Sequence, residues 1–147
     1  MIVAVTGHRV LQKNFSMQRL EESLLSLVGE GADTFLCGMA LGFDLACGEL
    51  VAKMKQTYPV KLVACIPCAD QCEKYPAKQR ARYGALLDAC DERVVLHEHY
   101  QNGCMFERNR YMVDRCDALL AYLVSERGGT YYTVNYAQKK GKRVLFL

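Results

Sequence analysis

Long apolar runs are missing from this sequence, since a stretch such as 118–124 is far shorter than the ~20 residues that a membrane-spanning helix requires. The first residues carry no basic stretch and no cleavage site, so we expect no secretory signal peptide. Low-complexity segments, long linkers and internal repeats are also missing. We therefore expect residues 1–147 to form a single domain.

An excess of charge of one sign is missing as well. The chain has 19 Lys+Arg against 16 Asp+Glu, which gives a net charge of +3. With 51% hydrophobic and 24% charged residues, the composition is that of an ordinary globular protein and excludes a disordered, collagen-like or coiled-coil chain. The small net charge does not favour a nucleic-acid partner, and no membrane partner is expected.

Cysteine is plentiful, with 8 residues, but a second Cys-x2-Cys pair is absent. Without a secretion signal, these cysteines are expected to be reduced thiols, which predicts a cytoplasmic location. Cys65, Cys68 and Cys72 have a spacing similar to that of iron–sulfur ligands, although Cys65 ends an apolar run typical of a buried strand. We predict no metal site, and leave open whether these three residues bind anything.

Short β-type runs alternate with helical patterns along the whole chain. The runs cover 2–6, 34–37, 60–66, 93–96, 118–123 and 143–147. Helical spacing of apolar residues is found over 17–28, 47–54 and 83–90, and further helices are expected over 105–115 and 130–140. This rhythm predicts βαβ units, hence a Rossmann-like three-layer α/β/α sandwich with a mostly parallel sheet. A ligand would bind at the carboxyl ends of the strands, near the topological switch point.

The turn after the first predicted strand contains Gly7, His8 and Arg9. Glycine permits close approach of the backbone, and the two basic side chains can donate to phosphate or carboxylate groups. On its own this turn is also compatible with a structural histidine and a solvated arginine.

Two glycine-containing turns each lead from a strand into a helix. In the first, Gly38 and Gly42 flank a loop, and Asp44 stands at the expected N-cap, where it either caps the helix or accepts from a ligand hydroxyl. The second contains Gly128, Gly129 and Thr130. Exposed backbone N–H groups at a helix start bind anions, so the pair of turns predicts a phosphate-bearing ligand.

The predicted helix over 105–115 places Asn109 on a stripe of apolar residues, where an amide is costly unless it is hydrogen-bonded. Arg108 lies beside this stripe. Arg110 and Asp114, four residues apart, are expected to form a surface pair. We therefore select Arg108 and Asn109, and not Arg110, as candidate ligand contacts.

Four segments taken together resemble one protein family. They are Thr6-Gly7-His8-Arg9, Gly38-Met39-Ala40-Leu41-Gly42-Phe43-Asp44, Arg108-Asn109-x2-Met112-Val113-Asp114 and Gly128-Gly129-Thr130. Their order and spacing are similar to those of the YpsA-like branch of the SLOG superfamily, which joins the Smf/DprA fold with the LOG phosphoribohydrolases. The resemblance covers nearly the whole chain.

The resemblance implies a Rossmann-like domain that binds a nucleotide or a nucleotide derivative. The implied ligand contacts are Gly7, His8, Arg9, Gly38, Gly42, Asp44, Arg108, Asn109, Gly128, Gly129 and Thr130. LOG enzymes cleave an N-glycosidic bond with an arginine, which Arg108 resembles, and with a glutamate in the last helix. No carboxylate follows Thr130 here, and only Asp44 or Glu49 could substitute for that glutamate.

We therefore predict a sensor or regulatory binding module for an ADP-ribose-like ligand, with Tyr131, Tyr132 or Phe43 available to stack on a base. No other cofactor is required. The first alternative is a nucleoside 5′-monophosphate phosphoribohydrolase in which Arg108 is catalytic. The second alternative is DprA-like binding of single-stranded DNA. Pairing with a second copy of the chain stays open.

Overall fold

A computed structural model describes all residues, 1–147, as six strands and five helices. The strands are β1 (Ile2–Gly7), β2 (Thr34–Cys37), β3 (Lys61–Ile66), β4 (Glu92–Val95), β5 (Ala118–Tyr122) and β6 (Arg143–Phe146). The helices are α1 (Met17–Gly29), α2 (Phe43–Met54), α3 (Ala77–Ala89), α4 (Cys104–Arg115) and α5 (Gly128–Lys139).

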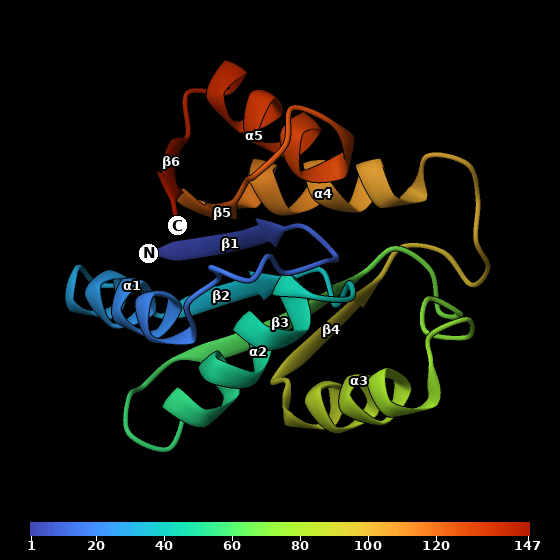
Figure 1. The fold of residues 1–147 in the computed structure, drawn as a ribbon, viewed down its shortest axis with the longest axis horizontal. Helices are drawn as coiled ribbons and strands as arrows, with labels where there is room; N and C mark the ends of the chain where they lie inside the picture. Colours follow the sequence, from blue (N-terminus) through green and yellow to red (C-terminus); the bar gives the residue numbers. More distant parts are fainter.

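The strands form one parallel sheet in the order β4-β3-β2-β1-β5-β6. The chain moves from β1 to β4 in one direction and from β5 to β6 in the other, so the switch point lies between β1 and β5. Figure 1 shows α4 and α5 on one side of the sheet and α1, α2 and α3 on the other. The predicted Rossmann-like α/β/α sandwich is confirmed.

Two apolar cores cover the two faces of the sheet. The larger core joins α1, α2 and α3 to the sheet through residues such as Leu24, Phe35 and Phe43, each of them 0% exposed. The smaller core lies under α4 and α5 and contains Val113 and Leu119. Because β5 is buried along its whole length, its sequence is continuously apolar and its position was predictable.

Several helices begin earlier than their sequence patterns predict, most clearly α2 at Phe43 and α3 at Ala77. The first six residues of α2, from Phe43 to Gly48, are all buried, so no polar face marks the helical period there. The interpretation of Asp44 as an N-cap is wrong, because the N-cap is Gly42 and Asp44 lies in the first turn. Thr130 is not a cap either, because α5 begins at Gly128 and its N-cap is Arg127.

No helix is long and apolar enough to cross a membrane. All eight cysteines are unpaired thiols, and Cys65 is buried in β3 as its apolar run indicates. No group of three or more His, Cys, Asp or Glu side chains is arranged to hold a metal ion.

Candidate functional site

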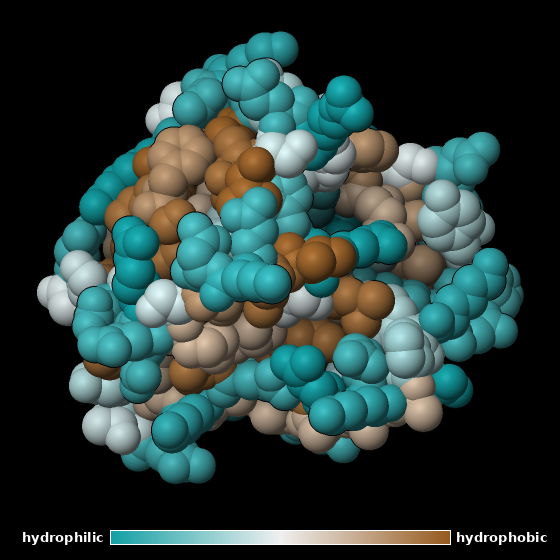
Figure 2. Space-filling view, in the orientation of Figure 1, coloured by the Kyte–Doolittle hydropathy of each residue, from teal (hydrophilic) through white to brown (hydrophobic).

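A cleft of about 680 Å³ opens at the carboxyl ends of the strands, beside the switch point between β1 and β5. It is lined by the end of β1 with the following loop, by the start of α2, by the first turns of α4 and by the start of α5. The lining residues are Thr6, Gly7, His8, Arg9, Val10, Gln12, Ala40, Asp44, Met105, Phe106, Arg108, Asn109, Val124, Gly128, Gly129 and Thr130. In the space-filling view the surface is hollowed here, with both hydrophilic and hydrophobic atoms at the edge (Figure 2).

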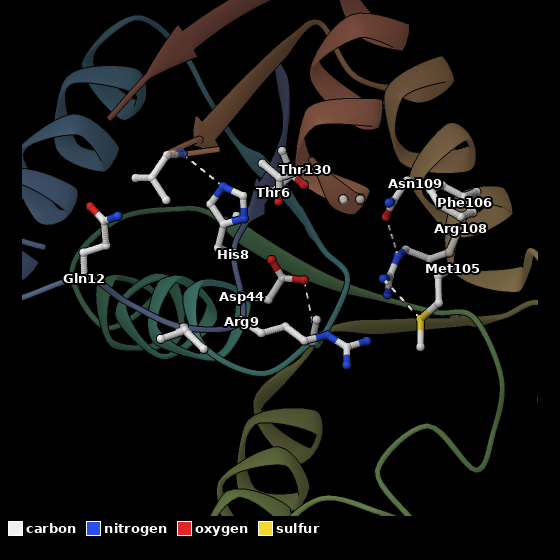
Figure 3. A pocket seen from close by; sticks show the side chains of 16 residues that line it. Thr6, His8, Arg9, Gln12, Asp44, Met105, Phe106, Arg108, Asn109 and Thr130 are labelled. Atoms are coloured by element: carbon white, nitrogen blue, oxygen red, sulfur yellow. Dashed lines mark hydrogen bonds between the residues drawn. The ribbon is translucent and has the colours of Figure 1, made fainter. Parts of the chain in front are cut away.

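The eleven ligand contacts implied by the resemblance all line this cleft except Gly38 and Gly42, whereas the stacking candidates Phe43, Tyr131 and Tyr132 do not line it. Segments that are far apart in the chain therefore meet at one opening. Figure 3 shows the side chains of Arg9 and Arg108 extending toward each other within it. The candidate contacts lie on one side of the molecule, as a common ligand site requires.

The start of α5 lines the cleft as a helix N-terminus without a side-chain cap. Its N-cap is Arg127, and no side chain caps the helix, so the first N–H groups of α5 have no side-chain acceptor. The neighbouring hydroxyl groups of Thr6 and Thr130 make no hydrogen bond, although these residues are only 6% and 5% exposed (Figure 3). Hydroxyl donors without a protein partner beside a helix start are suited to phosphate oxygens.

Arg108 is a buried cation, only 4% exposed, that lies on α4 between β2, β3 and the cleft. Its Nε donates to Asn109 Oδ1 at 2.8 Å, and its Nη1 donates to the carbonyl oxygens of Gly38 and, at 3.3 Å, of Cys65. All three acceptors are uncharged. Nη2 donates only to Met105 Sδ, at 3.9 Å, so one of its two N–H groups is left to donate to an anion.

Asn109 is 8% exposed and orients this arginine through its side-chain oxygen. Its amide nitrogen faces Gly129, because a Cβ placed on that glycine would lie 3.7 Å from Asn109 Nδ2. The amide thus connects the arginine to the start of α5. This contact explains why the helix carries a polar residue on its apolar stripe.

Arg110 points away from the cleft, as expected, but its predicted pair with Asp114 is wrong. Its Nη1 donates to the hydroxyl of Tyr132 at 3.0 Å, and Asp114 instead accepts from the hydroxyl of Tyr136 at 2.7 Å. The tyrosines on α5 compete for both partners because α5 packs directly beside α4.

Asp44 is the carboxylate of the cleft and is 5% exposed. Its Oδ2 accepts from the backbone N–H of Ala40 at 3.2 Å, whereas Oδ1 has no hydrogen-bond partner. Burial raises the pKa of this carboxyl to about 6, against the opposing effects of Arg108, the Ala40 amide and Arg9. A carboxyl group of this pKa can exchange a proton near neutral pH.

Gly38 and Gly42 do not line the cleft, because the protein's own groups pack against them. Gln71 Nε2 and Arg108 both donate to the Gly38 carbonyl, and Phe43 N–H donates to the His8 carbonyl at 3.1 Å. A Cβ on Gly38 would lie 2.7 Å from Arg108 Nη1. These two glycines permit close packing beneath the cleft.

His8 serves partly as a structural residue. Its Nε2 accepts the backbone N–H of Val124 at 2.9 Å and so ties the loop after β5 to the loop after β1. Partial burial lowers the pKa of this imidazole, which favours the neutral ring that such an acceptor requires. Only Nδ1 is left to donate to a ligand.

Sequence reasoning missed the apolar part of the lining, namely Val10, Met105, Phe106 and Val124. The only available signal was their position next to Arg9, Arg108 and the end of β5. Of the aromatic residues proposed for stacking, Phe43 is excluded because it is fully buried in the core.

Glu49 lies outside the cleft, since it forms a salt bridge with Arg82 at 2.5 Å on the far side of α2. It therefore cannot take the place of the glutamate of LOG enzymes. Asp44 is the single Asp or Glu among the lining residues.

Replacing Asp44 with asparagine is expected to stabilise the protein above pH 6. The folded pKa of about 6 exceeds the unfolded value of 3.8, so the folded state binds an additional proton between these values. The free energy of unfolding contributed by Asp44 therefore falls as the pH rises through this window. Urea denaturation should show equal stability of D44N and wild type below about pH 4 and a gain of at most about 3 kcal/mol for D44N above about pH 6. A difference that does not change with pH would contradict the assignment.

Comparison with known proteins finds one family and several relatives of this chain. The YpsA family model, described as the YspA SLOG family, matches residues 5–145. UPF0398 protein BH1768 of Halalkalibacterium halodurans is 29% identical over 142 residues, covering 94% of this chain and 75% of its own length. The SPbeta prophage-derived protein YoqJ of Bacillus subtilis is 28% identical over 145 residues, covering 86% of this chain and 85% of its own length.

Two solved structures share the fold. DNA processing protein A from Helicobacter pylori, described for its single-stranded DNA binding mode, superposes with a TM-score of 0.70 at 21% identity. DprA from Streptococcus pneumoniae superposes with a TM-score of 0.72 at 22% identity. The superpositions cover 99% and 98% of this chain but only 64% and 49% of those proteins. The family model matches almost the whole sequence, which confirms the resemblance expected from the sequence motifs. The chain belongs to the YspA SLOG family.

Proposed function

We propose that the cleft binds a nucleotide-derived ligand through its phosphate. The observation that carries this proposal is the meeting of three anion-binding features in one cleft, namely the uncapped start of α5, Nη2 of Arg108 and the side chain of Arg9. A phosphate at α5 would accept from the backbone N–H groups of Gly129 and Thr130 and from Arg108.

The remaining polar groups suit a ribose. Asp44 Oδ1 has no partner and can accept from a sugar hydroxyl, and Asn109 Nδ2 makes no hydrogen bond within the protein. The volume of about 680 Å³ lies within the range of small-molecule sites, ~300–1,000 Å³. It has room for a ligand of the size of a nucleotide. We regard the protein as a sensor or regulatory module for such a ligand.

The proposal is tested by thermal unfolding in the presence of AMP, other nucleoside 5′-monophosphates, ADP-ribose and ribose 5-phosphate. A ligand at 100 times its Kd should stabilise the folded state by about 2.7 kcal/mol. At least one of these compounds is expected to raise the unfolding temperature. The proposal fails if none of them does so at millimolar concentration.

Replacing Gly129 with alanine is expected to weaken this binding without unfolding the protein. The added Cβ has space, since its nearest neighbour would be Asn109 Nδ2 at 3.7 Å, but it would separate a phosphate from the N–H groups of α5. Titration calorimetry should show a loss of affinity of about tenfold, with an unchanged or slightly higher unfolding temperature. The control is Gly84→Ala on α3, where a Cβ would meet nothing within 4 Å and would lie outside the cleft. Equal affinities of the two variants would contradict a phosphate at α5.

A second candidate function is hydrolysis of the N-glycosidic bond, and the position and pKa of Asp44 favour it. In this reaction water adds to C1′ of the ribosyl group, the bond to the base breaks, and the products are free base and ribose 5-phosphate. Asp44 would accept the proton of the attacking water, because its pKa of about 6 makes it a base near neutral pH. Incubation with nucleoside monophosphates and chromatography for free base tests this function, with Asp44→Asn as the inactive control. If no free base is released, the protein does not hydrolyse these nucleotides, and ligand binding stands as its function.

Single-stranded DNA is the third candidate ligand, because the Helicobacter pylori structure was described for that interaction. A short oligonucleotide in the same titration separates it from a mononucleotide. Binding to phosphates along a strand weakens steeply as salt is raised, whereas a single phosphate held in the cleft responds less. We expect the mononucleotide to bind better at physiological salt.

A further inference from the structure

Three of the residues that line the cleft are exposed apolar side chains, although the inner end of the cleft is polar. Val10, Phe106 and Val124 are 78%, 40% and 43% exposed. An exposed apolar rim around a polar site indicates a ligand that has an apolar part as well as a phosphate.

Phe106 is the one Phe or Tyr among the lining residues. It lies in the first turn of α4, two residues before Arg108, so the same helix supplies the aromatic ring and the buried cation. Figure 3 shows Met105 beside the guanidinium of Arg108 on this wall of the cleft, with Phe106 on the same helix. Because both residues line the cleft, a ligand whose phosphate contacts Arg108 can also reach the Phe106 ring.

The Phe106 ring is held in place from behind. It packs against Tyr132 of α5 in an edge-on contact, with ring centroids 4.7 Å apart. Tyr132 is itself fixed, since its hydroxyl accepts from Arg110 and its ring stacks on Tyr136. A ring fixed in this way loses little freedom on binding, so more of its stacking energy would appear as affinity.

We propose that the Phe106 ring is the platform on which the base of the ligand stacks, and that this contact makes the site prefer nucleotides over sugar phosphates. This inference rests on the proposed function, because the phosphate at α5 is what brings the base to the ring. Arg110 and Tyr132 are positioning residues that hold the platform. The apolar side chains of Val10 and Val124 contact the opposite edge of the base.

The experiment compares AMP with ribose 5-phosphate, which carries the same sugar and phosphate but no base. In the wild-type protein AMP is expected to bind at least about fivefold more tightly, as one stacked base provides. Phe106→Leu should reduce this ratio to about one by weakening AMP alone, while Phe106→Tyr should preserve it. Tyr58→Ala removes an aromatic residue that is 37% exposed and lies outside the cleft, and it should leave the ratio unchanged.

The outcomes separate this inference from the proposed function. If both ligands bind and Phe106→Leu leaves the AMP to ribose 5-phosphate ratio at its wild-type value, Phe106 is not the platform and the phosphate site stands. If the wild-type protein binds both ligands equally, no base is recognised and the inference is wrong. If neither ligand binds, the proposed function and the inference fall together. Because Phe106 is partly exposed and leucine keeps most of its volume, the thermal unfolding temperature should change little and will show that the variant is folded.

Discussion

Arg108→Lys is expected to weaken AMP binding by about 10- to 100-fold, the range that loss of a charged hydrogen bond provides. The guanidinium uses Nε and Nη1 on three neutral acceptors and keeps Nη2 for the cleft. A lysine ammonium has one nitrogen and cannot contact the carbonyls of Gly38 and Cys65 while also facing a ligand. Because lysine keeps the positive charge, a loss of AMP affinity in this variant would be due to the hydrogen-bonding geometry of the guanidinium and not to net charge.

The matched control is Arg110→Lys on the same helix. Arg110 points toward Tyr132 and does not line the cleft, and this change also preserves the charge. We expect R110K to reduce the affinity for AMP no more than about threefold, through the platform alone, and to leave ribose 5-phosphate binding unchanged. Similar losses of ribose 5-phosphate binding in R108K and R110K, measured by calorimetry, would show that Arg108 does not contact the phosphate.

Gly42→Ala is expected to reduce the free energy of unfolding by about 3 kcal/mol. Gly42 has φ of +76°, which is strained for any residue with a Cβ, and the added atom would lie 2.1 Å from the Arg9 carbonyl oxygen. The loop after β1 would have to move away from the start of α2. The hydrogen bond from Phe43 N–H to the His8 carbonyl would be weakened as a result.

Chemical denaturation of Gly42→Ala beside Gly84→Ala measures this effect. Gly84 lies within α3, with space for a Cβ and no positive φ, so alanine there should be neutral or stabilising by up to about 1 kcal/mol. Because His8 and Arg9 belong to the displaced loop, Gly42→Ala should also weaken AMP binding. Equal stability of the two variants would mean that the close contact between Gly42 and Arg9 does not exist in solution.

The fold was predictable because its strands are short apolar runs that a parallel sheet buries on both faces, as in β5. The location of the site followed from the same pattern, since the carboxyl ends of parallel strands meet at one edge. Thr6, Arg108 and Thr130 therefore lie in one cleft although they are far apart in the chain.

Other features of the site depend on contacts that spacing does not encode. Gly38 and Gly42 have the sequence pattern of an anion-binding loop, but the loop is filled by Arg108, Gln71 and the loop after β1. The pKa of Asp44 depends on its burial, which a local sequence does not reveal.

Phe106 was missed for a related reason. It is adjacent to Glu107 on a helix whose apolar stripe lies on another face, so its sequence context is that of a solvent-exposed residue. Only the packing of α4 against α5 places its ring at the cleft, through the contact with Tyr132.

The central claim is that the start of α5 holds a phosphate, and NMR titration of the 15N-labelled protein with AMP tests it most directly. The backbone amides of Gly129 and Thr130 are expected to shift strongly as they begin to donate to phosphate oxygens, together with the side-chain amide of Asn109. The amide of Phe43 at the start of α2 already donates to His8 and should move much less. Shifts centred on α2 instead of α5, or no shifts at millimolar AMP, would contradict the account.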